Sequence, residues 1–326
     1  MYKRQQLDDA GIMDKQKIAE TGIVATIQGK NPKKQVVALR GDMDALPILE
    51  ANDVPYKSLN TGVMHACGHD VHTSCLLGAA KIINLLRDDF EGTVKLIFQP
   101  GEEKLPGGAS VMIKEGVLKN PEVNQIIGQH VMPLLPVGTV GFRKGLYMAS
   151  TDEIYMTIRG KGGHGAQPHQ NIDPVVVMAQ VITALQQVVS RIASPIIPSV
   201  LSFGKVIANG ATNVIPDRVE MEGTFRAMDE EWRSEAHQLM VQMAEGIATS
   251  MGGRCEFRVE RGYPFLVNDT PLTHFAQDAA RAYLGADNVV QLDLRMTAED
   301  FSYYSQIMPA CFYRLGTRNV AKGIVS

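Results

Sequence analysis

The sequence has few cysteines, no long uninterrupted apolar run and no signal-peptide core. Four cysteines in 326 residues do not suggest a disulfide framework. The most apolar stretch, residues 175–189, is interrupted by glutamines and falls short of the ~18 residues that a membrane span needs. Residues 1–9 are polar and lack the apolar core of a signal peptide. These absences favour a protein of the reducing cytoplasm.

The sequence also lacks any block of like charges. Lys and Arg number 32 and Asp and Glu 35, which gives a net charge of −3. This near balance argues against nucleic acid and anionic membranes as partners. The 45% hydrophobic and 21% charged residues are typical of a globular protein, and the length exceeds what one core usually supports. We therefore expect two domains.

The sequence excludes two functions that are usually recognised by short motifs, dinucleotide binding and serine hydrolysis at a G-x-S-x-G elbow. Residues 160–165 satisfy G-x-G-x-x-G, but the next helix is expected only from Asp173, so no helix N-terminus would meet a pyrophosphate. The G-x-S-x-G elbow of many serine hydrolases is absent from the sequence. Neither dinucleotide binding nor this type of serine catalysis is predicted.

The first half of the chain alternates expected strands with expected helices. Strands are predicted at residues 36–39, 93–98 and 125–128, and helices at 70–86 and 108–115. This alternation predicts a mostly parallel sheet, whose binding sites gather beyond the carboxyl ends of the strands. Each of the three strands is followed by a cluster of polar residues.

The pattern changes after residue 149 to the order β-α-β-β-α-β, which is the ferredoxin-like arrangement. Its expected elements are residues 153–159, 173–191, 200–207, 219–226, 230–251 and 255–260. A helix (270–283) and a strand (311–315) follow. We therefore predict an α/β catalytic domain in two pieces, residues 1–149 and 262–326, interrupted by an inserted α+β domain at 150–261.

The densest cluster of metal-binding residue types is the segment His65-Ala66-Cys67-Gly68-His69-Asp70. Thiolate and imidazole are donors that zinc-like ions accept, and Gly68 would let the loop bend so that Cys67 and His69 converge. The alternative is a buried thiol near a few loop histidines.

Further candidates follow the other strands. Glu102 and Glu103 are adjacent, so their side chains cannot point the same way: one can bind a cation while the other accepts a proton from water. A solvated acidic turn is the alternative. His130 would add a donor on the same sheet edge, and Asp42 or Asp44 could ligate a metal or orient a metal-binding imidazole.

The motifs together resemble the M20 metallopeptidases, and more closely their amidohydrolase branch of hippurate hydrolases, aminoacylases, indole-acetyl-amino-acid hydrolases and N-acetyl-diaminopimelate deacetylases. The similarity covers nearly the whole chain. It rests on ordered segments, namely residues 40–47, 65–70, 99–103, 163–166, 213–216, 223–226 and 299–301.

The resemblance implies a metal site in the sheet domain with four protein ligands, Cys67, His69, Glu103 and His130. It implies that Glu102 is the general base and that Asp44 supports the metal site. The cofactor would be two divalent ions per subunit in the complete protein, and Zn, Mn, Co or Ni would suit these donors.

The same resemblance implies that the inserted domain acts as a lid and forms a homodimer. His164 would reach a neighbouring subunit's active site and stabilise an oxyanion there. Asn213 and Arg226 would bind the substrate's carboxylate. The alternative for these three residues is that they are surface or interface polar groups.

Two departures from the family pattern are expected to matter. The family has a further metal-ligating histidine near its C-terminus, whereas no histidine follows His274 in this sequence. Members of the family also begin with a strand and a helix that have no counterpart before Leu7 in this sequence. Both pieces of the catalytic domain are therefore expected to be incomplete, and the activity of this chain is left open.

The predicted function is metal-dependent hydrolysis of the amide bond of N-acyl amino acids or related small amides. A dipeptidase or carboxypeptidase on the same scaffold is the first alternative, and a metal-free binding protein that keeps the fold is the second. The sequence does not distinguish the acyl group, the amino acid or the metal.

Overall fold

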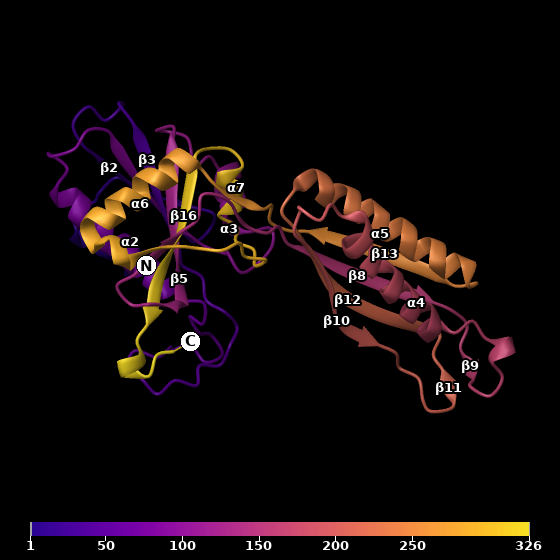
Figure 1. Cartoon of the computed structure of the whole chain (residues 1–326). Helices are drawn as coiled ribbons and strands as arrows, with labels where there is room; N and C mark the ends of the chain where they lie inside the picture. The colour runs from indigo at the N-terminus through magenta and orange to yellow at the C-terminus, as the bar shows by residue number, and fades with distance from the viewer. Residues whose placement is uncertain (1, 326) are drawn as a thin grey trace. The chain divides into compact units, whose positions relative to one another are not determined.

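The computed structural model describes residues 2–325, and the chain divides into two compact units (Figure 1). Unit 1 comprises Met1–Tyr147, Leu266–Leu294 and Glu299–Ser326, and unit 2 comprises Met148–Phe265 and Arg295–Ala298. The boundaries predicted from the sequence lie at 149/150 and 261/262, and the catalytic and lid roles given to those domains stay predictions.

Unit 1 is built on an eight-stranded sheet in the order β1-β2-β4-β3-β5-β16-β6-β15. Its strands are β1 (Lys15–Ile18), β2 (Gly22–Gln28), β3 (Val36–Asp42), β4 (Thr93–Gln99), β5 (Gln125–Pro136), β6 (Val140–Phe142), β15 (Val289–Gln291) and β16 (Ala310–Arg318). Four of the seven pairings are parallel: β3 with β4, β3 with β5, β5 with β16, and β6 with β15. The predicted α/β class with a mostly parallel sheet is confirmed.

Helices cover both faces of this sheet. They are α1 (Tyr2–Asp9), α2 (His69–Leu85), α3 (Gly108–Lys114), α6 (Thr270–Leu284) and α7 (Ser302–Ser305), with short 3-10 turns η3 (Ala286–Asn288) and η4 (Val320–Lys322). Along β16, Cys311 shares a buried cluster with Leu272 of α6, whereas the ring of Phe312 lies 4.9 Å from that of Phe301 beside α7. Successive side chains of a strand alternate between faces, so α6 and α7 lie on opposite faces.

The prediction for the third strand was wrong in length. It was expected to end at residue 128, but β5 continues to Pro136 because its pairing with β16 runs on as far as Arg318 opposite Pro136. The hairpin of β1 and β2 was missed because β1 has the polar sequence KQKI. A separate two-stranded sheet joins β7 (Gly145–Met148) and β14 (Leu266–Asn268).

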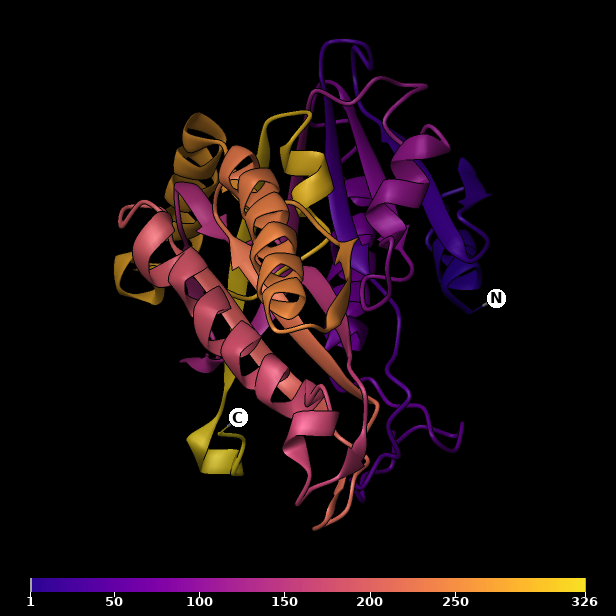
Figure 2. The ribbon, with the colours of Figure 1, turned by 90° about the vertical axis from the view of Figure 1, so that its right-hand side faces the viewer.

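Unit 2 contains a four-stranded antiparallel sheet in the order β10-β12-β8-β13, which is the ferredoxin-like order that the sequence predicted. Its elements are β8 (Asp152–Arg159), α4 (Pro174–Gln187), β10 (Ser199–Ile207), β12 (Arg218–Ala227), α5 (Glu230–Ser250) and β13 (Arg254–Arg261). The two helices lie side by side on one face of the sheet (Figure 2). The side chains of Asp173 and Asp229 cap α4 and α5.

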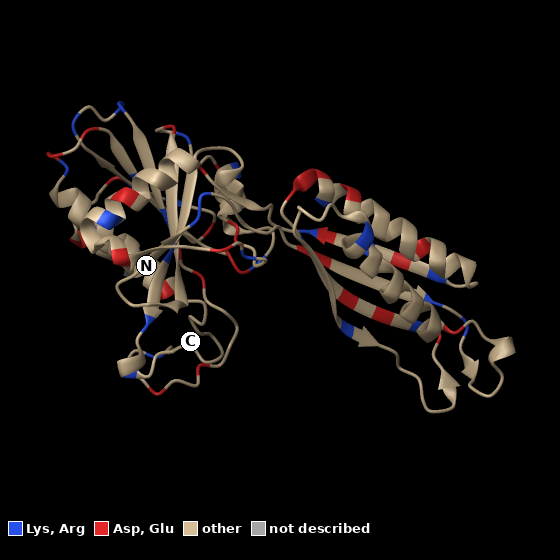
Figure 3. Ribbon diagram, viewed as in Figure 1, with Lys and Arg blue, Asp and Glu red and all other residues tan. Residues whose placement is uncertain are grey.

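The opposite face of the unit 2 sheet is polar. Cross-strand ion pairs join Arg159 to Glu256 and Lys205 to Glu222, and both signs of charge are distributed over each unit (Figure 3). Exposed pairs of this kind contribute little to stability, so the apolar contacts under α4 and α5 hold this unit together.

The G-x-G-x-x-G segment has no helix at its end, as predicted. It forms β9 (Gly163–His164), which pairs with β11 (Val214–Ile215) and is followed by the 3-10 turn η1 (Pro168–Gln170). Helix α4 begins only at Pro174.

Helix α4 and the following π-helical turn η2 (Val188–Ile192) are together long and apolar enough to cross a membrane by length and composition alone. In the structure, however, Val181, Leu185 and Val188 are fully buried in the core of unit 2. One such helix is weak evidence for a membrane span, and 28% of this segment is buried in the structure.

Candidate metal centre and active site

The candidate site residues of unit 1 meet beyond the carboxyl ends of parallel strands. In chain order they are Asp44 after β3, Cys67 and His69 at the start of α2, Glu102 and Glu103 after β4, and His130 within β5. The ligand atoms of Cys67, His69 and His130 lie within 4.8 Å of one another, and so do those of His69, Glu102 and Glu103. The structure therefore brings all of the predicted unit 1 residues together around His69.

His69 is the common member of these groups, and only 1% of its surface is exposed. Its Nδ1 lies 3.1 Å from Asp44 Oδ1, whereas its buried Nε2 has no hydrogen-bond partner within residues 2–325. Burial alone would lower the pKa of His69, but the contacts with Asp44, Cys67 and Asp42 raise it to about 11. The surroundings thus favour a positive charge at Nε2, either a proton or a bound cation.

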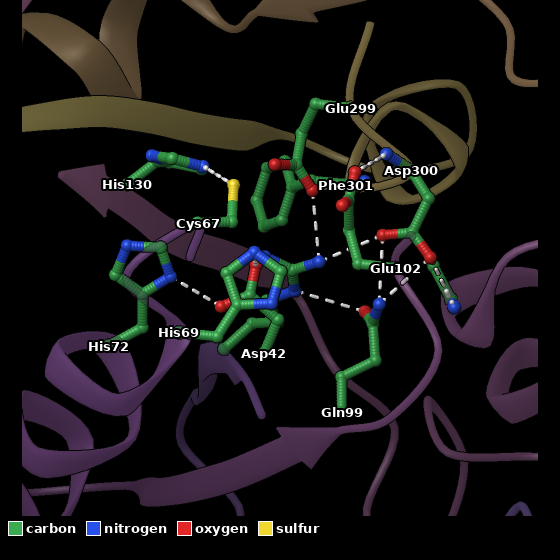
Figure 4. A network of polar contacts seen from close by, with 12 residues as sticks. Asp42, Cys67, His69, His72, Gln99, Glu102, His130, Glu299, Asp300 and Phe301 are labelled. Atoms are coloured by element: carbon green, nitrogen blue, oxygen red, sulfur yellow. Dashed lines mark hydrogen bonds and ion pairs between the residues drawn. The ribbon is translucent and has the colours of Figure 1, made fainter. Parts of the chain in front are cut away.

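Cys67 and His130 form a second pair beside His69 (Figure 4). His130 Nδ1 donates to the carbonyl oxygen of Val131 at 2.7 Å, and Nε2 lies 3.4 Å from Cys67 Sγ. Burial and the nearby Arg314 lower the pKa of His130, so the ring is neutral and Nε2 offers a lone pair. Gly68 has φ +87°, and a Cβ there would lie 2.5 Å from Val131 Cγ2, so glycine is needed where α2 begins.

The donor set fits a divalent metal. These donors form two overlapping groups, Cys67-His69-His130 and His69-Glu102-Glu103, which share His69, and within each group the ligand atoms lie within 4.8 Å of one another. The first offers an orphaned imidazole nitrogen, a lone pair on a second imidazole and a thiol, and the second adds carboxylates. Burial raises the pKa of the Cys67 thiol, and a bound cation would be needed to favour its thiolate form.

His72 and Asp42 lie close to this set but are satisfied by other partners. His72 Nδ1 donates to Asp42 Oδ1, and the amide of Val131 donates to His72 Nε2 at 2.9 Å. Asp42 also accepts from Arg40 Nη1 at 2.7 Å. Despite burial, Arg40 and His72 hold the pKa of Asp42 far below its usual range, so this carboxylate stays charged.

The adjacent glutamates differ in environment. Glu103 is exposed, and its amide donates to Asp44 Oδ2 at 2.9 Å, so Asp44 connects this loop to His69. Glu102 is only 7% exposed, and burial together with Glu299 and Asp300 raises its pKa well above the usual value. A buried carboxyl group with raised proton affinity beside a metal-ligand set is suited to proton transfer.

A network of buried polar groups, missed by the sequence analysis, supports Glu102 (Figure 4). Arg40 Nη2 donates to Glu299 Oε1 at 2.9 Å and to Asp300 Oδ1 at 2.8 Å. Gln99 donates to both Asp300 oxygens at 2.8 Å. Arg40 is 2% exposed and Asp300 is 0% exposed. The segments 40–47, 99–103 and 299–301 carried part of the family resemblance, but nothing in them indicated that they meet. Asp300 lies 201 residues from Gln99 and 260 residues from Arg40.

The three candidates in unit 2 are not gathered at one place. His164 and Asn213 are exposed neighbours at the two-stranded β9–β11 sheet, where the amide of Gly165 donates to Asn213 O at 2.8 Å. Arg226 lies eight residues along β12 from Arg218, about 26 Å at 3.3 Å per residue. Arg226 Nη1 is buried and has no hydrogen-bond partner in the described part of the chain.

A parallel-sheet unit with convergent Cys, His and Glu donors and a neighbouring buried carboxyl group defines the class of metal-dependent hydrolases. The comparisons with known proteins agree. Residues 38–325 match the model of peptidase family M20/M25/M40, and the chain belongs to this family. It is an enzyme of the hydrolase class.

Three relatives illustrate the similarity. The N-acyl-L-amino acid amidohydrolase of Geobacillus stearothermophilus is 44% identical over 264 residues, which are 81% of this chain and 70% of the relative. The thermostable carboxypeptidase 2 of Saccharolobus solfataricus is 39% identical, with 94% of this chain and 77% of the relative covered. The crystal structure of Bacillus subtilis YXEP, described as a dinuclear metal binding peptidase from M20 family, has a TM-score of 0.81 at 37% identity and covers 97% of this chain and 82% of its own.

Proposed function

We propose that this chain hydrolyses the amide bond of N-acyl amino acids, with Glu102 as the group that accepts a proton from the attacking water. The observation that carries this proposal is the placement of Glu102, a buried carboxyl group with a raised pKa, in one group with His69 and Glu103. Support for the substrate class comes from the relative named N-acyl-L-amino acid amidohydrolase.

Cys67, His69, Glu103 and His130 would hold divalent metal, and Asp44 would fix the ring of His69 through Nδ1. When bound, a divalent ion polarises a carbonyl group and lowers the pKa of water towards ~7. We propose two ions per subunit in the complete protein, by analogy with the dinuclear neighbour, and zinc, manganese, cobalt or nickel as candidates.

Glu102 would move the proton twice. In its charged form it accepts a proton from the water that attacks the amide carbon, and it then donates that proton to the nitrogen of the leaving amine. Its burial keeps bulk water from competing, and its raised pKa makes the carboxylate a stronger base towards the attacking water.

His164, Asn213 and Arg226 would serve the substrate. His164 would stabilise the developing oxyanion, and Asn213 and Arg226 would bind the substrate carboxylate. The orphaned Nη1 of Arg226 supports an anionic ligand. Because ~26 Å of β12 separates Arg226 from the end of the unit that carries the β9–β11 sheet, one small substrate can meet all three residues only if they come from two subunits. We therefore propose a homodimer through the inserted unit.

A carboxypeptidase or dipeptidase activity is the second candidate, and the similarity to a protein named thermostable carboxypeptidase favours keeping it. It would use the same unit 1 residues. A cytoplasmic location is proposed on the four free cysteines, which suit a reducing compartment.

The test is a hydrolysis panel of acetyl- and benzoyl-amino acids against dipeptides, run on the purified protein with and without a chelator. We expect turnover of the N-acyl amino acids, its loss with chelator and its recovery on adding back metal. Turnover that survives complete removal of metal would overturn the proposal. Turnover of dipeptides alone would select the second candidate.

A further inference from the structure

The loop between β4 and α3, residues 100–108, carries Glu102 and Glu103, and its two ends approach closely. The amide of Gly108 donates to Gly101 O at 2.9 Å. A Cβ at Gly108 would lie 1.5 Å from the carbonyl oxygen of Pro100, so only glycine allows this approach. The two ends of the loop are therefore in contact, and the residues that hold them together determine where Glu102 and Glu103 lie.

The carboxylate of Asp300 binds both ends of this loop. Gln99, the last residue of β4, donates its side-chain amide to both Asp300 oxygens at 2.8 Å, and the amide of Ala109 in the first turn of α3 donates to Oδ2 at 2.9 Å. The backbone amide of Asp300 also donates to Glu102 Oε1 at 3.4 Å. One residue thus contacts the start of the loop, its end and the glutamate between them.

Arg40 connects this closure to the other side of the site. Its Nη2 donates to Asp300 Oδ1 and its Nη1 donates to Asp42, the residue that fixes His72. Asp300 is completely enclosed, and burial raises its pKa to about 7 although the charge of Arg40 opposes this shift and so offsets part of the cost of burying the carboxylate.

A cation site at Glu102, Glu299 and Asp300 is the competing explanation of this acidic cluster. These residues do lie within 4.8 Å of one another. However, Asp300 already receives donors from Arg40, Gln99 and Ala109, and Glu299 receives them from Arg40 and the Phe301 amide. Because these carboxylates already accept hydrogen bonds from protein donors, the cluster is better explained as a contact that holds the loop ends together than as a site for a further cation.

We infer that Asp300 is a positioning residue, whose carboxylate ties the two ends of loop 100–108 together and so holds Glu102 and Glu103 facing His69. The inference rests on the proposed function for its catalytic consequence only. Displacement of a reacting group by about 1 Å can cost about a hundredfold in rate, so loss of the closure should lower kcat.

The test compares Asp300→Ala and Asp300→Asn with the parent protein in two measurements, hydrogen exchange and steady-state kinetics. In both variants, amide exchange over residues 100–109 should rise by about tenfold or more while α6 remains protected. The kcat should fall about a hundredfold in Asp300→Ala and less in Asp300→Asn, with KM nearly unchanged. Asp300→Asn keeps the shape of the side chain, so it can be used for both measurements if Asp300→Ala does not fold.

The matched control is Asp269→Ala, which removes the N-cap of α6 in the same unit, where Asp269 accepts from the Leu272 amide at 2.8 Å. It should lower the melting temperature without changing kcat or exchange in loop 100–109. Unchanged loop exchange in both Asp300 variants, or a rise spread over all of unit 1 with kcat preserved, would overturn the inference. If Glu102→Gln kept full turnover, the role of Glu102 would fail, whereas the exchange result would still decide the loop closure.

Discussion

The polar residues of the two units are organised in opposite ways. In unit 1, side chains from the ends of several strands converge, are buried and share His69. In unit 2, His164 and Asn213 lie exposed at the two-stranded β9–β11 sheet, and Arg226 lies about 26 Å away along β12. Unit 1 therefore brings its candidate residues together within one chain, whereas the joint action proposed for the unit 2 residues requires a second chain. Four predictions test this contrast, from the largest expected effect to the smallest.

The largest effect is expected from Glu102→Gln. The amide keeps the size of the side chain but cannot accept a proton, so kcat should fall by 10³-fold or more. Metal content, measured by elemental analysis, should not change because Glu102 is not among the proposed ligands. Glu122→Gln, at an exposed glutamate, is the control and should keep kcat. Retained turnover in Glu102→Gln would remove this residue from the proton-transfer role.

Cys67→Ser should weaken metal binding by a hundredfold or more, since a hydroxyl is a poor replacement for a thiolate ligand. Cys75 lies on the exposed side of α2, so Cys75→Ser should bind metal as the parent does. Competition with a chromogenic chelator measures both affinities. Equal affinities in the two serine variants would mean that Cys67 is not a ligand.

Mixing two inactive variants tests whether unit 2 residues act on the neighbouring subunit. In a heterodimer of His164→Ala with Glu102→Gln, one of the two sites would combine an intact Glu102 with an intact His164. Random exchange of subunits should therefore restore about a quarter of the parent activity. A mixture of His164→Ala with Asn213→Ala should restore no activity, because both residues lie at the β9–β11 sheet of the same subunit. No recovery in the first mixture would contradict action across subunits.

The smallest effect is expected from Asp173→Ala, which removes the cap that accepts from the Val175 and Val176 amides of α4. The free energy of unfolding, measured with urea, should fall by about 1 kcal/mol. The kcat and KM should not change, because this cap is structural. A fall in kcat without loss of stability would show that α4 has a role in the reaction.

The same contrast explains how much could be predicted from the sequence. Cys67, Glu102 and Glu103 could be predicted to converge with His69 because strand ends of a parallel sheet meet at one edge. The ferredoxin-like order of unit 2 followed from its element pattern.

The buried contacts that hold Glu102 in place could not be predicted from the sequence. Arg40 and Asp300 meet across 260 residues of sequence, and nothing local in either segment indicates the partner. The continuation of β5 past residue 128 depended on its pairing with β16, which is also non-local. Local patterns thus located the candidate ligands, whereas the contacts that hold them depend on the folded chain.

The central claim is that Cys67, His69, Glu103 and His130 together hold the divalent metal of unit 1. Anomalous diffraction at the absorption edge of the metal found by elemental analysis tests it most directly. We expect two peaks among these side chains, with a peak at about 2.3 Å from Cys67 Sγ and a peak at about 2.0–2.1 Å from the Nε2 atom of each of His69 and His130. A protein that binds no stoichiometric metal, or a peak away from these four side chains, would contradict it.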